Sequence, residues 1–206
     1  MPNFLRECVA REGQEDALRD DLVAAHERFA RAMPHLVEVL LYREHFMSRR
    51  FLSIVRYDDE RAVASLERSE MLDALAALER ARCDGPGDSR PLVLLYEHAA
   101  VPQRGQYSVI ALLTALSEGT ANEVGRRMAG GANALVERFK PTRLVVARVV
   151  DRLRLLVMLD AGQAIDIDRY LASSLRRQHM DALAPYLSAP PQWYALDPVW
   201  RYFRDD

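Results

Sequence analysis

The first half of the sequence holds three side chains whose types suit proton transfer. His26 lies at the edge of an apolar helical stripe, Tyr57 ends an apolar, strand-like run, and Arg43 lies in a second such run. A neutral imidazole can accept a proton, and a phenol or a guanidinium can hydrogen bond to the resulting oxyanion in a water-poor slot. These residue types therefore indicate proton removal followed by stabilisation of an anion.

Each of the three also has a purely structural interpretation. His26 fits a boundary histidine with one nitrogen in water, and Tyr57 fits a core tyrosine whose hydroxyl bonds to the backbone. Arg43 is one of several charges in apolar segments, where a charge must be paired, line a polar cavity or lie at a rim. The charges of this kind are Arg6, Glu7, Arg43, Glu44 and Arg56.

Other candidate side chains are distributed over both halves, so which half holds a working pocket is left open. Small residues at 129–132 would leave room above a sheet, and Trp193 could form the floor of a flat aromatic slot. Close helix packing with the tryptophans as plugs is the alternative. The expected substrate-binding residues are Tyr42, His98, Arg148, His179 and Trp193.

Two apolar stretches with polar turns, residues 36–57 and 142–159, predict β-hairpins. Apolar residues at helical spacing precede and follow each hairpin, which predicts four helices. In the first half the helices are expected at 15–33 and from Val63 to Leu78. In the second half one is expected to begin at a capping box, Thr120–Glu123, and the other to cover 166–184. With further strands at 4–11, 91–98, 107–116 and 193–202, each half is expected to read β-α-β-β-α-β.

Landmarks recur along the chain at almost one spacing. Glu12-Gly13, Pro34 and Asp73–Ala76 reappear 106, 107 and 108 residues later. We interpret this as a duplication, with a first repeat at 1–100, a linker at 101–106 and a second repeat at 107–206.

The β-α-β-β-α-β order is the ferredoxin-like plan, with both helices on one face of an antiparallel sheet. Strands as apolar on both sides as 144–150 and 153–159 need cover on the other face too. We therefore expect an α+β chain in which tandem ferredoxin-like repeats pack sheet to sheet as an intrachain pseudo-dimeric α/β barrel.

Composition excludes several classes of function. A net charge of −2 and a pI near 6.2 give no basic excess for nucleic acid, and no apolar run is long enough to cross a membrane. The only cysteines, Cys8 and Cys83, have no metal-like spacing and predict a reduced, cytoplasmic protein. Phosphate-loop, serine-elbow and HExxH patterns are missing, and no metal site is expected.

The stretch from Tyr57-Asp-Asp-Glu-Arg-Ala-Val-Ala into Arg68-Ser-Glu-Met-Leu-Asp-Ala-Leu, with the element order, resembles the antibiotic biosynthesis monooxygenase group of dimeric α/β barrels. Leu159-Asp160 and Gln178-His-Met-Asp-Ala-Leu carry the resemblance in the second copy, so it covers nearly the whole chain as two fused copies. It implies a pocket between sheet and helices and, in several members, oxygenation of electron-rich polycyclic phenols without metal or flavin.

Two departures from the family pattern are visible. Many members have Trp at the end of the third strand, where Tyr57 and Leu159 stand here, and the haem-ligating histidine of the haem-degrading relatives is replaced by alanine, at Ala76 or Ala77 and at Ala184. His179, nearby in the same helix, keeps haem binding open.

The resemblance implies a cofactor-independent monooxygenase of polycyclic phenols, anthrones or hydroquinones in aromatic polyketide biosynthesis. Its partners would be a small aromatic substrate and molecular oxygen, with self-association as a homodimer left open. A non-catalytic ligand-binding or assembly module, and a haem- or flavin-dependent enzyme, are the alternatives. The expected catalytic residues are His26, Tyr57 and Arg43.

Overall fold

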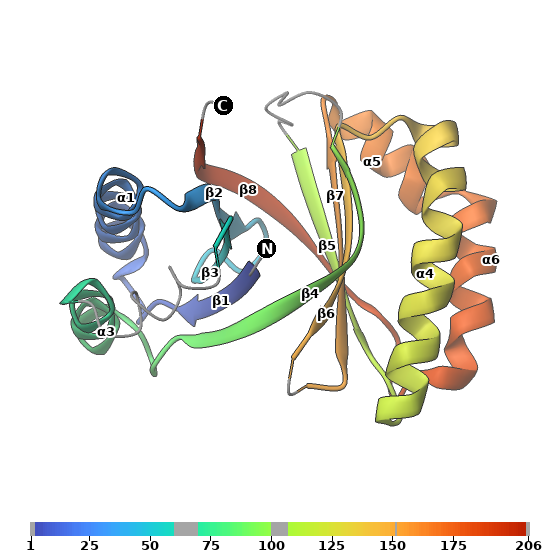
Figure 1. Ribbon diagram of the computed structural model, residues 1–206, viewed down its shortest axis with the longest axis horizontal. Coiled ribbons are helices and arrows are strands. Elements are labelled where there is room, and N and C mark those ends of the chain that lie inside the picture. The colour runs from blue at the N-terminus through green and yellow to red at the C-terminus, as the bar shows by residue number, and fades with distance from the viewer. Residues whose placement is uncertain (1–2, 60–69, 100–106, 151, 205–206) are drawn as a thin grey trace. The chain divides into compact units, whose positions relative to one another are not determined.

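The computed structural model describes residues 3–59, 70–99, 107–150 and 152–204, and it divides into two compact units (Figure 1). Unit 1 comprises Met1–Pro91 and Asp197–Asp206, and unit 2 comprises Leu92–Leu196. The elements are β1 (Asn3–Val9), α1 (Glu15–Ala32), β2 (Leu36–Glu44), β3 (Arg50–Tyr57), α3 (Glu70–Arg82), β4 (Asp88–Ala99), β5 (Tyr107–Thr114), α4 (Glu118–Phe139), β6 (Arg143–Val149), β7 (Arg154–Ala161), α5 (Ala164–Leu171), α6 (Ser174–Leu183), a 3₁₀ turn (Ala184–Tyr186) and β8 (Gln192–Phe203).

The sheet of unit 1 is built on β3, which pairs antiparallel with β1 on one side and with β2 on the other. Side chains of a strand alternate between its two faces. Phe4, Arg6 and Cys8 therefore share one face of β1, and this is the face that α1 and α3 cover. Val39 and Tyr57 lie on the same face of β2 and β3.

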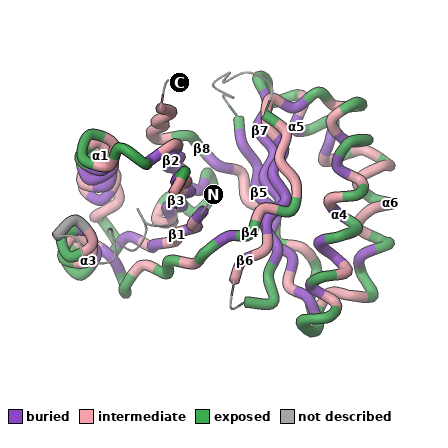
Figure 2. Tube along the Cα trace, viewed as in Figure 1, coloured by how far each residue is buried: buried purple, intermediate pink, exposed green. Residues whose placement is uncertain are grey.

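Helix α1 is amphipathic, and its buried residues form one stripe at helical spacing (Figure 2). It ends before Pro34, as predicted, because the residue before a proline is disfavoured in the helical conformation. The buried stripe consists of Leu18, Leu22, Ala25, His26 and Phe29.

The sheet of unit 2 follows the same plan. Strand β7 pairs antiparallel with β5 and β6, the 92–99 part of β4 pairs with β6, and the 192–196 part of β8 pairs with β5. Helices α4, α5 and α6 cover one face of it (Figure 1). Helix α4 ends at Phe139, and Lys140 caps it in the left-handed conformation, followed by Pro141.

Two expectations for the helices of unit 2 are wrong. The cap of α4 lies at Ser117, whose hydroxyl accepts from the Thr120 backbone N–H at 3.2 Å, so the helix begins earlier than the Thr120–Glu123 capping box would place it. The expected helix at 166–184 is divided into α5 and α6. Ser173 causes the break, because its hydroxyl donates to the carbonyl of Tyr170 at 2.7 Å and accepts from the N–H of Arg176 at 3.1 Å.

The predicted fold class is confirmed. The chain is an α+β protein, and its hydrogen-bonded strand order, β1-β3-β2-β8-β5-β7-β6-β4, is that of a closed barrel.

Residues 63 and 66 of the second expected helix and the expected linker at 101–106 lie outside the described residues, and the domain boundaries stay a prediction. None of the described helices combines the length and apolar character needed to span a bilayer.

Candidate functional site

Unit 1 contains a cavity of about 330 Å³ between its sheet and the helices α1 and α3. This volume is within the range of small-molecule sites. Its polar residues are Arg6 on β1, His26 on α1, Ser53 and Tyr57 on β3, and Ser89 on β4. Its apolar residues are Phe4, Phe29, Val39, Val55, Leu72, Leu75 and Pro91.

His26 is the buried base of this cavity, with 4% of its surface exposed. Its Nδ1 lies 2.6 Å from the carbonyl oxygen of Leu22, and because a carbonyl can only accept, Nδ1 carries the proton. Nε2 is then left with its lone pair, and no residue that the structure describes bonds to it. The ring packs 6.2 Å from Trp200, measured between ring centroids.

Burial keeps the imidazole of His26 neutral. Desolvation lowers the pKa of His26, the hydrogen bond to the Leu22 carbonyl acts in the opposite direction, and the positive charge of Arg6 lowers the pKa further. At neutral pH the residues that line the cavity therefore include a neutral imidazole, whose Nε2 can accept a proton.

Tyr57 is a hydrogen-bond donor that lines the same cavity from β3. Burial raises the pKa of Tyr57 to about 12, so the phenol stays protonated at neutral pH. Within the described part of the chain the hydroxyl has no hydrogen-bond partner, and the ring meets Phe4 edge-on with centroids 6.3 Å apart. The hydroxyl is thus free to donate to a ligand.

Arg6 supplies a positive charge that is fixed in place. Its Nε and Nη2 donate to the two carboxylate oxygens of Glu79 at 2.6 and 2.5 Å, and the Glu79 side chain is only 2% exposed. The backbone N–H of Gly87 donates to the same carboxylate at 3.0 Å. The apolar cavity thus combines one proton acceptor with fixed donors, an arrangement that can take a proton from a bound acid and stabilise its anion.

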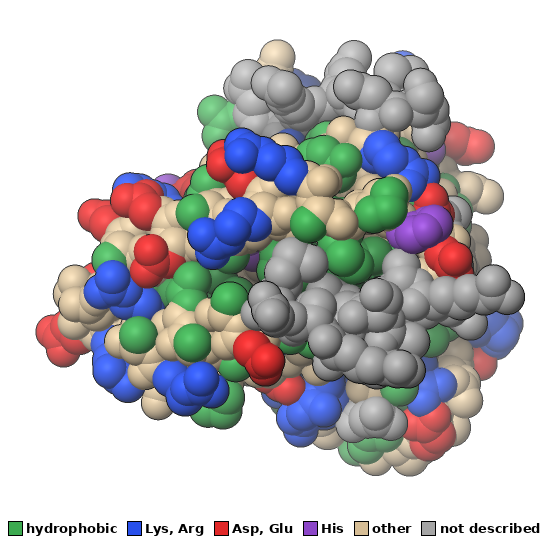
Figure 3. All heavy atoms as spheres, turned by 60° about the vertical axis from the view of Figure 1, so that its left-hand side comes forward, with side chains coloured by type: hydrophobic (Ala, Val, Ile, Leu, Met, Phe, Trp, Pro, Cys, Tyr) green, Lys and Arg blue, Asp and Glu red, His purple; other side chains and the backbone are tan. Residues whose placement is uncertain are grey.

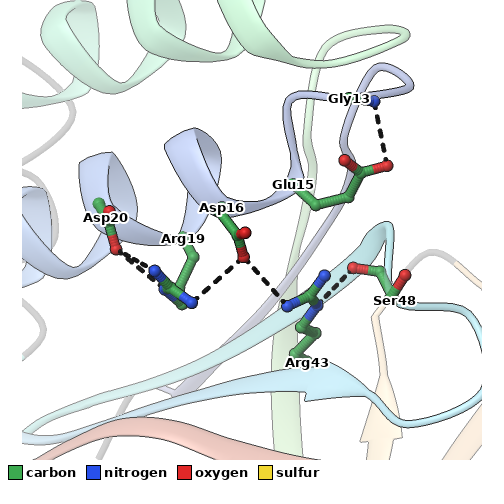
Figure 4. Close-up of polar contacts among 7 residues, drawn as sticks. All are labelled: Gly13, Glu15, Asp16, Arg19, Asp20, Arg43 and Ser48. Carbon is green, nitrogen blue, oxygen red and sulfur yellow. Dashed lines mark hydrogen bonds and ion pairs between the residues drawn. The ribbon is translucent and has the colours of Figure 1, made fainter.

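The structure places Arg43 and Tyr42 away from this cavity. Arg43 donates to the Ser48 carbonyl at 2.6 Å and pairs with Asp16 at 3.5 Å, in a surface network that continues to Arg19 (Figure 4). Tyr42 is fully buried, with the Arg201 guanidinium 5.5 Å from its ring centre. Because strand residues alternate, Tyr42 lies on the opposite face of β2 from Val39 and the cavity.

The other predicted ligand contacts all belong to unit 2. His98 lies on β4 opposite Leu144, and Arg148 pairs with Glu118 and donates to Asn122 at 2.7 Å. Neither residue lines the cavity of unit 1. We therefore leave both out of the proposed site.

The helix layer of unit 2 is closely packed at the remaining predicted positions. A Cβ atom on Gly131 would lie 2.9 Å from Cε1 of His179, so Gly131 makes room for this ring. Trp193 packs 6.1 Å from Tyr170, which in turn meets Phe139 at 5.6 Å between ring centroids. His179 thus packs against α4.

Two further observations concern metal ions and nucleic acid. The described residues contain no group of three or more histidine, cysteine, aspartate or glutamate side chains that could hold a metal ion. On the face in Figure 3, the coloured basic and acidic side chains are interspersed, without the single-signed patch that nucleic acid would favour.

Arg6 lines the cavity, although the sequence predicted it only as one of several charges in apolar segments and did not place it in the site. Its strand position carried the signal, because Phe4, Arg6 and Cys8 alternate on one face and a charge between two apolar residues must be paired or line a cavity. Its partner Glu79 lies 73 residues away, and no local pattern connects the two. Ser53 and Ser89 gave no recognisable signal.

Solved structures with similar folds cover nearly the whole chain. A proposed monooxygenase of Fusobacterium nucleatum matches 98% of this chain and 94% of its own, with a TM-score of 0.82 and 5% identity. A proposed monooxygenase of Lactobacillus acidophilus NCFM matches 98% of this chain and 96% of its own, with a TM-score of 0.75 and 6% identity. An anthrone oxidase-like protein matches 98% of this chain and 92% of its own, with a TM-score of 0.74 and 9% identity.

Identities this low establish the fold alone. No model of a known protein family matches the chain, and no curated protein does. The resemblance in fold to two fused copies of the antibiotic biosynthesis monooxygenase type of dimeric α/β barrel is nevertheless confirmed, because monooxygenase-like structures match across both halves.

Proposed function

We propose that the chain is a cofactor-independent monooxygenase that oxidises an electron-rich polycyclic phenol, anthrone or hydroquinone in aromatic polyketide biosynthesis. The observation that carries this proposal is the neutral His26, whose Nε2 is left without a described partner in an apolar cavity that also holds Tyr57 and Arg6. The similar folds of proposed monooxygenases and of an anthrone oxidase-like protein support the reaction class.

The reaction begins with proton transfer. Nε2 of His26 accepts a proton from the substrate, while Tyr57 and Arg6 donate hydrogen bonds to the oxyanion that forms. For an anthrone, the ring CH₂ group loses this proton and the carbonyl oxygen becomes the anion.

The anion then passes an electron to molecular oxygen, and the two radicals combine into a carbon–oxygen bond. The peroxide anion that results takes the proton back from Nε2 of His26, which restores the neutral base. The hydroperoxide then loses water as its O–O bond breaks and the carbon gives up its second hydrogen, which converts the CH₂ carbon into a carbonyl. One oxygen atom of O₂ is thereby incorporated and the other leaves as water. The apolar cavity walls exclude bulk water from the reacting anion.

Oxygen consumption by the purified chain with anthrone tests the proposal. We expect uptake above the uncatalysed rate, and a product that carries one labelled atom from ¹⁸O₂. Uptake no faster than in buffer, for anthrone and for hydroquinones, would contradict it. Tight binding of these compounds without turnover would favour the ligand-binding alternative instead, and a visible chromophore in the purified protein would favour haem or flavin dependence.

A further inference from the structure

The guanidinium of Arg6 is held in a way that proton abstraction alone does not require. Glu79 engages the Nε and Nη2 edge of the Arg6 guanidinium, which leaves its remaining N–H groups without a partner among the described residues. Arg6 lines the cavity, whereas Glu79 lies behind it at 2% exposure. The ion pair therefore holds a guanidinium with unused donors in a residue that lines the cavity.

Such donors favour one class of ligand. The other cavity walls are largely apolar, and in poorly hydrated surroundings a hydrogen bond from a guanidinium to an anionic oxygen is stronger than one to a neutral acceptor. A neutral ligand of equal shape would make the same apolar contacts, but its hydrogen bond to the guanidinium would be weaker.

We propose that Arg6 is the specificity-determining residue of the cavity and that it selects aromatic ligands carrying an anionic oxygen, namely carboxylates, phenolates or enolates. This inference rests on the proposed function only in taking the cavity as the ligand site, and it does not require turnover. Glu79 is the positioning residue, because it holds the guanidinium without lining the cavity.

The loop before β4 makes this positioning testable from outside the cavity. A Cβ atom on Gly87 would lie 2.4 Å from Oε1 of Glu79, so a side chain there must displace the carboxylate. Because the carboxylate is the end of a flexible side chain, the fold can absorb this movement. A Cβ atom on Gly85, two residues earlier in the loop, would meet nothing within 4 Å, so Gly85→Ala is the matched control.

The experiment compares 2-naphthoate with its neutral isostere 2-naphthamide by calorimetric titration of the full chain. The wild-type protein should bind the carboxylate about 10- to 100-fold more tightly than the amide. The double variant Arg6→Met with Glu79→Met removes both charges together and so leaves neither one buried and unpaired, and its preference should fall to about one.

Gly87→Ala should weaken 2-naphthoate binding several-fold and leave 2-naphthamide binding unchanged, while Gly85→Ala should change neither. Equal wild-type affinity for the two probes, or an undiminished preference in the double variant, would overturn the inference. If the preference behaves as expected but anthrone causes no oxygen uptake, the inference stands and the proposed oxygenase fails.

Discussion

At the scale of single residues, the account depends on which nitrogen of His26 holds the proton. The Leu22 carbonyl fixes the proton on Nδ1, and Arg6 and burial together oppose a second one on Nε2. The sequence could place His26 at the edge of an apolar stripe. It could not reveal the protonation state, because the hydrogen bond to the Leu22 carbonyl sets the tautomer and the charge of Arg6, from another element, opposes the second proton.

A pH profile tests this base. Because the pKa of folded His26 lies below its ordinary value of about 6.5, kcat/KM should hold constant through neutral pH and fall only as the pH drops below that value. Stability follows the same direction. The unfolded chain binds the proton first, so the stabilisation by neutral His26 is complete above about pH 6.5 and is lost as the pH falls through the lower folded pKa. An acid limb centred above pH 7 would be inconsistent with His26 as the base.

Tyr57→Phe separates a ligand contact from a core tyrosine. Because no described residue bonds to the hydroxyl, its removal should change the free energy of unfolding by less than about 1 kcal/mol. Loss of a donor to the oxyanion should lower kcat/KM about 100-fold. Urea titration and steady-state kinetics measure the two quantities, and a destabilised variant with unchanged kcat/KM would instead support the core interpretation.

At the scale of elements, the spacing of apolar residues predicted the helices and hairpins, because an element that buries one face carries a periodic pattern in its own local sequence. Pro34 and Pro141 likewise placed two helix ends correctly. The break at Ser173 and the early start at Ser117 were missed, because a serine cap acts through its own hydroxyl and leaves no apolar period to read.

The small residues of α4 allow a matched test of close helix packing. Gly131→Ala should destabilise the protein by about 1–3 kcal/mol, because the new methyl group would meet the His179 ring. Gly130→Ala has open space at the same helix turn and should stabilise it by about 0.5–1 kcal/mol, since alanine is the better helix former. Thermal unfolding of both variants is the measurement, and equal effects would refute the assigned packing.

At the scale of the whole molecule, similar halves have different interiors. The duplicated landmarks predicted one plan for both, and each unit does place helices on one face of an antiparallel sheet. The position of the cavity was not predictable, because it depends on how large side chains fill each helix–sheet layer. Tyr170 and Trp193 fill that layer in unit 2, whereas polar residues line a cavity there in unit 1.

If unit 2 serves as scaffold, its predicted ligand contacts can be changed without kinetic cost. His98→Gln and Arg148→Gln should each alter kcat/KM for anthrone by less than about twofold, well below the effect of losing a donor to the oxyanion. A large fall in kcat/KM in either variant, with the fold intact by circular dichroism, would instead return the working site to unit 2.

The most direct measurement is the rate of oxygen uptake with anthrone by wild-type protein and by His26→Gln, at equal concentration and with circular dichroism as the check on folding. Glutamine removes the basic nitrogen but keeps a side chain of similar reach. We expect uptake by the variant to fall about 100- to 10,000-fold relative to wild type, to near the uncatalysed rate. Uptake by a folded variant that equals the wild-type rate would contradict the assignment of catalysis to the cavity of unit 1.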